Sequence, residues 1–551
     1  MVSEECWWDR EADVVVLGSG GAAMTAAIAA HDFGAKDVVI LEKTGMVGGT
    51  TAMSGGMLWI PGNHHQIEAG IGEDDEDVVA YLDALSPGQL DPDTLMAFME
   101  SGPEMIRWFA DRTPVRFHAF ADFPDYQPYM PGAKPDGGRS LDNAAFSFKR
   151  LGKWAARVNP SKMAYPLRGS LMEAITGALD EDALAEREEG DFRGLGQALA
   201  GSLFLAVIER EIPVEFEMRA RRLVKEAGRV TGVIAEDAAG HEIAVRARRG
   251  VVIATGGFEW NEALVKTFLR GPLTGPVSVP ENEGDGLLMA MEAGAQLGNM
   301  SHAFWMQSAL EFKPQHRDAK PNYMLGSDER ARPGAILVNR KGERFVNEAA
   351  NYNAIGKALH AFDAGTHSYA NLPYWLIIDQ RYRNRYQTFN TPPGGPVPSY
   401  MIEGATLEEL AEKAGIDPRG LSATVERFNA MVRKGHDDDF QRGDNSYDNF
   451  YMWGDTAYDP PFRTLGEIGE APFFAVRMEA GALGTAGGPR TNGDAQVLDW
   501  NGDVIPGLYA AGNAMAAVLG EAYGGAGGTL GPGMTFGYIA GRHLGRHIPN
   551  R

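Results

Sequence analysis

Residues 13–42, DVVVLGSGGAAMTAAIAAHDFGAKDVVILE, decide the fold. Residues 13–17 form a short apolar run that predicts a parallel strand buried on both faces, and residues 37–41 predict a second such strand. The alanine-rich residues 22–33 between them predict a helix, which Gly34 ends. A strand, a helix and a second strand in this order predict an α/β fold.

The turn between the first strand and the helix carries the glycine pattern of a dinucleotide site. It reads Gly18-Ser19-Gly20-Gly21-Ala22-Ala23, a GxGxxA form. Gly18 allows the tight turn, Gly20 lets the backbone approach a pyrophosphate, and the small Ala23 lets helix and strand pack. Glu42 ends the second strand at the spacing of a carboxylate that binds a ribose hydroxyl. These features in register predict a dinucleotide site.

Two further glycine-rich segments favour FAD over NAD. Residues 43–56, KTGMVGGTTAMSGG, add glycines and hydroxyls directly after the acid, as an extended FAD requires. Residues 512–538 form a glycine-dense loop followed by an apolar run that predicts a helix from Pro532 to Leu544. The positive end of that helix would favour the anionic edge of a reduced flavin. The competing interpretation of this loop alone is a surface turn before a terminal helix.

The strand at residues 250–257 ends in Ala-Thr-Gly-Gly and is also expected to lie against the cofactor. The residues that we expect to contact FAD are Gly18, Gly20, Gly21, Ala22, Ala23, Glu42, Lys43, Gly48, Gly49, Thr50, Thr51, Ser54, Gly55, Gly56, Ala254, Thr255, Gly256, Asp285, Gly512, Asn513, Thr529 and Leu530.

Composition narrows the class of protein. A chain of 551 residues with 44% hydrophobic and 23% charged residues predicts a globular protein of two or more domains. The net charge of −23 argues against binding to nucleic acid or to an anionic membrane surface. The single cysteine, Cys6, excludes an internal disulfide and fits a reducing, cytoplasmic compartment. No apolar run has transmembrane length, so we expect at most a peripheral membrane contact, with residues 171–179 as a lid or a weak contact.

The block EK-x4-GG-TT-x2-SGG at residues 42–56 resembles the flavoprotein superfamily of fumarate reductases, succinate dehydrogenase flavoprotein subunits and 3-ketosteroid dehydrogenases. The resemblance implies a Rossmann-like FAD-binding domain, residues 1–275 and 470–551, with an inserted α+β capping domain at residues 276–469. It also implies non-covalent FAD, because His64 and His65 lack the His-Thr context of covalent attachment. We expect the acidic run Asp437-Asp438-Asp439 to be a solvated loop.

The residues around the expected flavin decide between substrates. Fumarate reductases resemble this chain but carry a proton-delivering arginine four positions after the residue that matches Glu348, and Tyr352 stands there here. No arginine lies between Gly512 and Gly541, so a dicarboxylate would lack charge-assisted hydrogen bonds. Tyrosines and backbone amides suit a neutral ketone instead. A fumarate- or urocanate-reductase-like enzyme remains an alternative, as does a non-redox isomerase or hydratase.

The patterns Asn347-Glu348-x3-Tyr352 and Gly512-Asn513 to Tyr523-x3-Gly527 resemble 3-ketosteroid Δ1-dehydrogenases. The resemblance implies that Tyr523 and the Gly527 amide hold the ketone oxygen and that Tyr352 takes a proton from the neighbouring carbon. A third tyrosine from an early proline-rich loop assists, and Tyr126 matches best, with Tyr129 in reserve. The substrate would be a hydrophobic steroid ketone that gains a C1–C2 double bond. The sequence does not identify the electron acceptor, for which a quinone-like molecule is one candidate.

Three positions depart from that family or stand out beside it. Gly524 replaces a proline that often follows the loop tyrosine, which favours a more mobile loop. Gly525 stands where the related Δ4-(5α)-dehydrogenases have a proton-carrying serine, so the Δ1 reaction is favoured over the Δ4 alternative. Glu521 is a rival base. A buried tyrosine base also needs a nearby donor or cation, because burial raises the pKa of a phenol.

Overall fold

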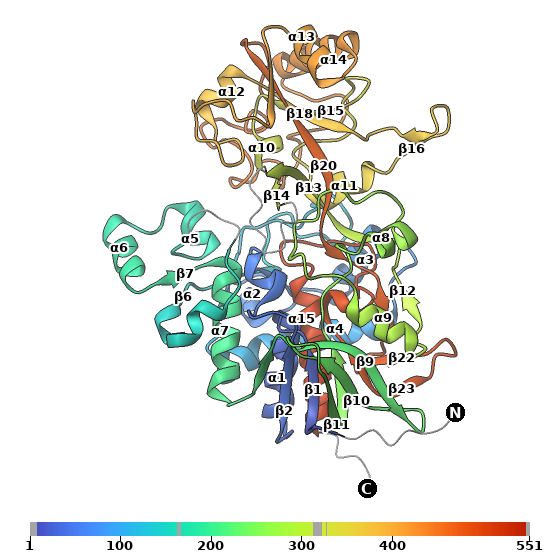
Figure 1. Cartoon of the computed structure of the whole chain (residues 1–551). Coiled ribbons are helices and arrows are strands. Elements are labelled where there is room, and N and C mark those ends of the chain that lie inside the picture. The colour runs from blue at the N-terminus through green and yellow to red at the C-terminus, as the bar shows by residue number, and fades with distance from the viewer. Residues whose placement is uncertain (1–7, 162–166, 312–321, 327, 547–551) are drawn as a thin grey trace.

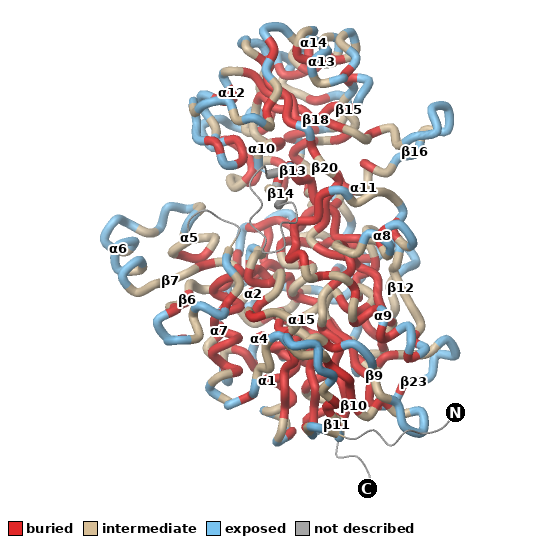
Figure 2. Tube along the Cα trace, viewed as in Figure 1, coloured by how far each residue is buried: buried red, intermediate tan, exposed pale blue. Residues whose placement is uncertain are grey.

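The structure is a computed structural model that describes residues 8–161, 167–311, 322–326 and 328–546, so Cys6 lies outside it. Two lobes are stacked in Figure 1. The lower lobe is built on the sheet that contains the first strand, and the upper lobe is built on a second sheet. Buried backbone runs through both sheets and through the region where the lobes meet (Figure 2).

The first sheet has the strand order β22-β23-β11-β1-β2-β8, with β10 and β9 added antiparallel beside β11. Its strands are β1 (Arg10–Leu17), β2 (Val38–Glu42), β8 (Val214–Phe216), β9 (Arg219–Glu226), β10 (Arg229–Glu236), β11 (Glu242–Ile253), β22 (Gln496–Leu498) and β23 (Val504–Ala510). The five strands from β23 to β8 run parallel, so their carboxyl ends share one edge. The predicted strands at residues 13–17 and 37–41 are confirmed, and Val14 to Leu17 are fully buried.

Helix α1 (Gly21–Asp32) and helix α15 (Leu530–Arg546) pack with their backbones in contact. Glycines at positions 533, 537, 541 and 545 recur every four residues and therefore line one face of α15. A Cβ atom on Gly537 would lie 2.3 Å from the Ala22 carbonyl oxygen, and one on Gly541 would lie 2.3 Å from that of Ala26. This packing places the first turn of α15 beside the glycine turn after β1.

The second sheet has the order β14-β13-β20-β18-β15, with β19 also paired to β20. Its strands are β13 (Ala303–Glu311), β14 (Asn322–Leu325), β15 (Ala335–Asn339), β18 (Tyr374–Asp379), β19 (Met401–Gly404) and β20 (Phe473–Thr485). The predicted inserted segment ends at residue 469, whereas this sheet also uses β20, which lies beyond that boundary.

The two faces of the second sheet carry different helices. Ile336 and Val338 pack with α13 (Leu407–Ala414) and α14 (Pro418–Lys434) on one face, because alternate residues of a strand share a face. Leu337 packs with Ile355 of α11 (Tyr352–Ala358) on the other face. Helix α11 therefore lies between the second sheet and the lower lobe (Figure 1).

The remaining helices lie around the two sheets. They are α2 (His64–Glu68), α3 (Asp75–Leu85), α4 (Pro92–Arg112), α5 (Leu171–Thr176), α6 (Glu181–Glu189), α7 (Leu195–Glu209), α8 (Glu262–Phe268), α9 (Asp285–Glu292), α10 (Asp328–Ala331) and α12 (Gln380–Arg385), with 3-10 turns at Gly49–Met53, Phe148–Arg157 and Gly512–Ala514. One three-stranded sheet, β3-β5-β4, and three strand pairs, β6-β7, β12-β21 and β16-β17, complete the described fold. Their bounds are β3 (Leu58–Trp59), β4 (Phe117–Ala119), β5 (Ser140–Asn143), β6 (Phe146–Ser147), β7 (Phe192–Arg193), β12 (Leu297–Gly298), β16 (Phe362–Asp363), β17 (Ser368–Tyr369) and β21 (Gly488–Pro489).

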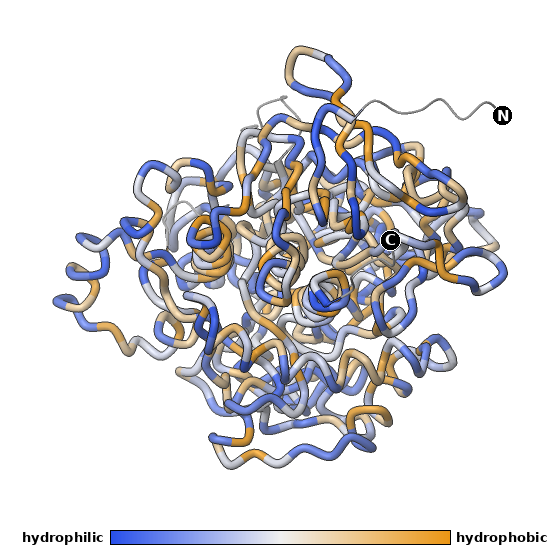
Figure 3. The backbone as a smooth tube through the Cα atoms, turned by 90° about the horizontal axis from the view of Figure 1, so that it is seen from below, coloured by the Kyte–Doolittle hydropathy of each residue, from blue (hydrophilic) through white to orange (hydrophobic). Residues whose placement is uncertain are grey.

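Hydrophilic and hydrophobic stretches alternate along the whole trace (Figure 3). Among the described residues, no helix combines the length and the apolar character needed to cross a bilayer.

Candidate active site

A cradle for a dinucleotide lies at the carboxyl edge of the first sheet. Gly18 has φ +96°, and a Cβ atom there would lie 2.6 Å from the Ala254 carbonyl oxygen. Only glycine fits such a turn. The Gly21 amide donates to Thr51 Oγ1 at 2.9 Å, which joins the first glycine turn to the second glycine-rich segment. The Ala22 methyl group faces Gly512, where a Cβ atom would lie 3.0 Å away.

Glu42 lies at the end of β2 with 8% of its surface exposed. Ser19 Oγ donates to its carboxylate at 2.6 Å and the Thr44 amide donates at 2.8 Å. Burial raises the pKa of Glu42, and these donors only partly oppose that rise. A carboxyl in this setting is placed to accept or share a hydrogen bond with a ribose hydroxyl.

Two expected cofactor contacts, Lys43 and Asp285, pair with one another. Lys43 Nζ lies 2.9 Å from the Asp285 carboxylate, and Arg219 lies 2.6 Å from it. The pair ties the end of β2 to the start of α9. These side chains therefore support the rim of the cradle.

Thr50 is held by a polar cluster that the sequence did not single out. Asn282 Nδ2 donates to Thr50 Oγ1 at 3.2 Å and to the buried Glu259 at 2.7 Å. Ser278 Oγ donates to the same Glu259 carboxylate at 2.5 Å. Glu259 is the second residue after Ala-Thr-Gly-Gly, and this closeness to the turn was the signal that the sequence offered.

A small hollow opens at the first turn of α15. Its lining includes five expected or neighbouring loop residues, Gly512, Asn513, Gly528, Thr529 and Pro532. Leu530 begins α15 there. Backbone amides and the positive helix end in such a hollow suit the anionic edge of a flavin.

Other expected contacts lie in the turns that surround the cradle. Thr255 Oγ1 is buried without a hydrogen-bond partner among the described residues. Gly256 and Gly56 take positive φ, at +78° and +71°. The rest of the set stands in the same turns or in the first turn of α1: Gly20, Ala23, Gly48, Gly49, Ser54 and Gly55. A buried hydroxyl that needs a hydrogen-bond partner, together with turns rich in glycine, fits an extended dinucleotide.

Three predicted tyrosines come together in one buried cluster. The hydroxyl of Tyr126 donates to that of Tyr352 at 3.1 Å. The rings of Tyr126 and Tyr523 stack with centroids 5.4 Å apart, and Tyr352 meets Tyr523 edge to face at 5.3 Å. Thr529 Oγ1 donates to the Tyr523 hydroxyl at 3.1 Å, which links the phenols to the wall of the hollow.

The loop that bears Tyr523 is tied to the loop that bears Tyr126. The Gly524 carbonyl accepts hydrogen bonds from the Tyr126 amide at 3.0 Å and from the Tyr81 hydroxyl at 2.7 Å. A Cβ atom on Gly524 would lie 2.8 Å from the Trp59 ring, so the residue at this departure from the family pattern packs against an aromatic wall.

Gly527 takes φ +96°, and a Cβ atom there would lie 2.4 Å from the Leu58 Cα. Its amide donates to no backbone or side-chain acceptor within the described ranges. A free amide on a rigid turn is available to donate to an oxygen of a ligand.

The structure separates the reserve candidates from this cluster. Tyr129 is 66% exposed, whereas Tyr126 is 4% exposed. Glu521 pairs with Lys357 at 3.2 Å and lies 3.6 Å from His302, so its carboxylate is engaged outside the group of phenols.

A buried ionic network fixes Tyr126. The preceding residue, Asp125, accepts from Arg139 at 2.6 Å and from Trp59 Nε1 at 2.9 Å. Arg139 also makes two bonds of 2.9 Å to the Glu73 carboxylate, and its side chain is fully buried. These buried ion pairs hold Asp125 and Arg139 in a fixed arrangement, because separating them would leave a buried charge without a partner.

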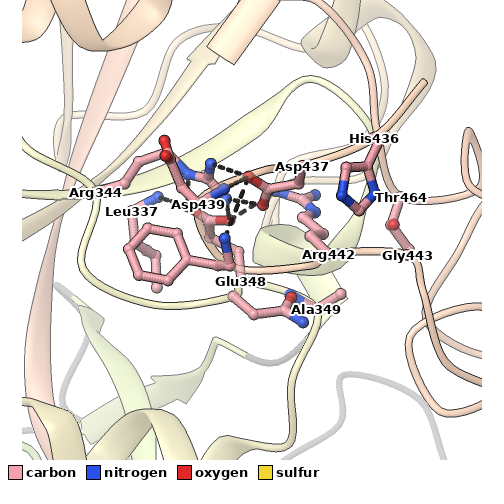
Figure 4. A network of polar contacts seen from close by, with 12 residues as sticks. Leu337, Arg344, Glu348, Ala349, His436, Asp437, Asp439, Arg442, Gly443 and Thr464 are labelled. Carbon is pink, nitrogen blue, oxygen red and sulfur yellow. Dashed lines mark hydrogen bonds and ion pairs between the residues drawn. The ribbon is translucent and has the colours of Figure 1, made fainter. Parts of the chain in front are cut away.

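A second buried network surrounds Glu348, four residues before Tyr352 in the chain (Figure 4). Glu348 is fully buried and accepts from Arg344 at 2.7 and 2.8 Å and from Arg442 at 3.1 Å. Burial alone would raise the pKa of Glu348, but the two guanidinium groups lower it below its ordinary value.

Asp437 completes this network by pairing with Arg344 at 2.8 Å. It is fully buried, so the prediction of a solvated loop is wrong for Asp437. Its neighbours Asp438 and Asp439 do pair with surface side chains, Lys434 and Arg427.

The phenols stand in an apolar setting. Burial raises the pKa of Tyr126 and of Tyr352 well above the ordinary value for tyrosine and also raises that of Tyr523. The surrounding side chains include Phe120, Phe123, Phe304, Phe450, Trp453, Leu171 and Met172. Leu171 and Met172 belong to α5, so part of the segment predicted as a lid or a weak membrane contact packs against this cluster. Such surroundings suit an apolar ring with one polar oxygen.

Comparison with known proteins supports an FAD-binding domain. Residues 13–530 match the model of the FAD binding domain family. The chain is 42% identical to a 4-oxocyclohexanecarboxylate 2-dehydrogenase of Sinomonas cyclohexanicum, over 97% of this chain and 92% of that protein. It is 38% identical to a 3-oxosteroid 1-dehydrogenase of Mycobacterium tuberculosis, over 97% and 98%.

A solved structure shares the whole fold. The crystal structure of 3-ketosteroid delta1-dehydrogenase from Sterolibacterium denitrificans in complex with 1,4-androstadiene-3,17-dione is 35% identical and aligns with a TM-score of 0.88. The alignment covers 97% of this chain and 99% of that one. The chain therefore belongs to the FAD binding domain family, together with the 3-oxosteroid 1-dehydrogenases, and is an FAD-dependent dehydrogenase.

Proposed function

We propose that this enzyme introduces a C1–C2 double bond into 3-ketosteroids. The observation that supports this most is the convergence of Tyr126, Tyr352 and Tyr523 in one apolar cluster, with two of the hydroxyls 3.1 Å apart. Phenols among aromatic side chains match a neutral fused-ring ketone better than they match a dicarboxylate.

In the proposed reaction, the Tyr523 hydroxyl and the Gly527 amide donate hydrogen bonds to the ketone oxygen. These bonds strengthen as negative charge develops on that oxygen, which acidifies the adjacent C–H bond. Tyr352 removes the proton from that carbon, and Tyr126 donates a hydrogen bond to Tyr352 and so stabilises its phenolate. Bound FAD supplies the acceptor for the hydride that leaves the next carbon. The two lost hydrogens leave a double bond conjugated to the ketone.

A second candidate substrate is a monocyclic ketone acid. The relative that shares 42% identity is a 4-oxocyclohexanecarboxylate 2-dehydrogenase, and it would use the same chemistry beside a ring ketone. This candidate needs a cation for the carboxylate, and the terminal loop from Gly512 to Gly541 contains no arginine. We therefore keep the steroid as the first proposal and the monocyclic acid as the second.

Other reactions fit less well. A fumarate- or urocanate-reductase-like enzyme would need an arginine where Tyr352 stands, and a Δ4-(5α)-dehydrogenase would need a serine where Gly525 stands. We further propose non-covalent FAD in a Rossmann-like domain, a capping domain built on the second sheet, and a quinone-like electron acceptor.

Turnover with an artificial electron acceptor tests the proposal. Purified enzyme is supplied with androst-4-ene-3,17-dione, with 4-oxocyclohexanecarboxylate and, with a reduced donor, with fumarate. Mass spectrometry of the products should show loss of two hydrogens from the steroid, and NMR should place the new double bond at C1–C2. Desaturation of the monocyclic acid alone would replace the first proposal by the second, and reduction of fumarate alone would overturn both.

A further inference from the structure

Two imidazoles and a carboxylate come together on the short helix α2, from His64, His65 and Glu68. One possible ligand atom from each residue lies within 4.8 Å of the other two. Over the part of the chain that the structure describes, no other three histidines, cysteines, aspartates or glutamates gather in this way. None of the three residues takes part in the proposed reaction.

The two histidine rings lie closer together than a regular helix would place them. Side chains of consecutive helical residues ordinarily do not face each other, yet the rings of His64 and His65 have centroids 3.9 Å apart. Nδ1 of His64 is buried and has no hydrogen-bond partner among the described residues. His65 Nδ1 lies 3.5 Å from the Glu68 carboxylate. A surface ion pair explains His65 and Glu68, but it does not explain why His64 turns in beside them.

Buried hydrogen bonds hold the backbone that presents these side chains. Asn63 and Gln66 are fully buried, and the Asn63 side chain accepts from the Gln66 amide at 3.0 Å. The Gln66 side chain accepts from the Gly62 amide at 3.1 Å and donates to the Glu73 carboxylate at 2.9 Å. A helix this short is not stable alone, so these bonds fix the geometry of the three side chains in advance.

The donor set selects the kind of ion. Imidazole nitrogens with one carboxylate oxygen suit zinc and similar divalent transition metals, whereas Ca²⁺ and Mg²⁺ prefer oxygen ligands. Ligand atoms around a tetrahedral zinc ion lie about 3.4 Å apart, because its bonds are about 2.0–2.2 Å long. The distance of 3.5 Å between His65 and Glu68 matches this spacing. Because the Glu68 side chain is 69% exposed, it can adjust without disturbing the core.

The neutral form of His65, which is the form that binds a metal, is favoured by its surroundings. Burial lowers the pKa of His65, as do His64 and, from the neighbouring strand β4, His118. His118 is not one of the three residues whose ligand atoms converge. The cluster therefore offers three protein ligands and leaves the remaining coordination positions to water.

We propose that His64, His65 and Glu68 form a binding site for one Zn²⁺ ion or a similar divalent transition metal. The ion would join the first and last residues of α2. It would stabilise the folded enzyme, because a ligand that binds only the folded chain shifts the equilibrium towards it. The site is separate from the ketone chemistry and does not depend on the proposed function.

The test is calorimetric titration of the untagged holoenzyme with Zn²⁺ after a chelator has removed bound metals. The variants His64→Gln, His65→Gln and Glu68→Gln each remove one ligand, and none of these residues is fully buried. The matched control is His241→Gln, which removes an exposed imidazole that pairs with Asp237 at 3.2 Å outside any such group of three. A parallel titration uses Mg²⁺ in place of Zn²⁺.

We expect the wild type to bind one Zn²⁺ per chain, with a higher thermal midpoint when Zn²⁺ is present and no binding of Mg²⁺ at the same concentrations. Each ligand substitution should weaken Zn²⁺ binding by about 100-fold or more, because even the outer-shell partners of metal ligands contribute about 10–100-fold. His241→Gln should bind as the wild type does. Anomalous diffraction at the zinc edge should locate the ion between the three side chains. Unchanged zinc affinity in His64→Gln or in His65→Gln, or no saturable binding in the wild type, would overturn the proposal.

Discussion

The hydroxyl oxygens of Tyr126 and Tyr352 lie 3.1 Å apart although 226 positions separate the residues in the chain. Tyr126 comes from a loop of the lower lobe, and Tyr352 begins α11 beneath the second sheet. The phenol pair therefore exists only when both lobes are folded and in contact. Each tyrosine has its own buried ionic support, through Asp125 on one side and Glu348 on the other.

Replacing either phenol should remove turnover without removing the cofactor. Tyr352→Phe is expected to lower kcat by about 10²–10⁴-fold, because a positioned acid or base contributes that much, and Tyr126→Phe should act in the same direction with a smaller effect. The yellow FAD absorbance of the purified variants should equal that of the wild type. The matched control is Tyr129→Phe, which alters an exposed phenol and should retain full activity.

Gly527→Ala should damage the turn that presents the free amide. The new methyl group would meet the Leu58 backbone at 2.4 Å in addition to the strain of a positive φ, so we expect a loss of about 1–3 kcal/mol in the free energy of unfolding. Displacing the amide should lower kcat with the ketone by about 10²–10³-fold.

Gly228→Ala provides the comparison for Gly527→Ala. Gly228 also has a positive φ, at +83°, but a Cβ atom there meets nothing within 4 Å. It should lose only about 1–2 kcal/mol and keep its activity. Equal kinetic effects of the two substitutions would show that the contact with Leu58 and the amide have no special role.

Glu348→Gln should destabilise the protein strongly. The substitution leaves the buried Arg442 without a carboxylate, since Asp437 pairs with Arg344, and a broken buried pair costs about 3–5 kcal/mol. Denaturant unfolding measures the loss. The control is Glu262→Gln, which removes an exposed pair with Lys266 and should change stability little.

The same network predicts an acid limit of stability. The folded protein lowers the pKa of Glu348 and of Asp437, so at mildly acidic pH the unfolded chain binds more protons than the folded one. Their contribution to stability is therefore complete at neutral pH and is lost as the pH falls below about 4.5. Melting temperatures at pH 7 and at pH 4 should differ less in Glu348→Gln than in the wild type. An equal fall in both proteins would assign the acid sensitivity to other groups.

The sequence predicted the first strand, the glycine turn, the helix and Glu42 correctly, because each depends on neighbours within thirty positions. It also named three tyrosines that the structure brings together. The resemblance ranked Tyr126 above Tyr129, but nothing in the local sequence of the loop explains why Tyr126 is the buried one. That choice depends on Arg139, which buries the residue before Tyr126 through an ion pair across the fold.

Burial of Asp437 was missed for a similar reason. A run of three aspartates is hydrophilic in any local window, and only Arg344, 93 positions away, makes burial of the first one favourable. No local pattern predicts the pairing of β20 with β13, β18 and β19 either, because those strands are far apart in the chain.

In the proposed reaction, Tyr523 and Gly527 hold the ketone oxygen and Tyr352 takes a proton from the adjacent carbon. Bound FAD would accept the hydride from the next carbon. The most direct measurement is anaerobic rapid mixing of the holoenzyme with androst-4-ene-3,17-dione while the oxidised flavin absorbance is followed. The wild type should bleach within one turnover, and Tyr352→Phe, with the same FAD content, should stay yellow over that time. A wild-type spectrum that stays oxidised, or a Tyr352→Phe variant that bleaches as fast as the wild type, would contradict the account.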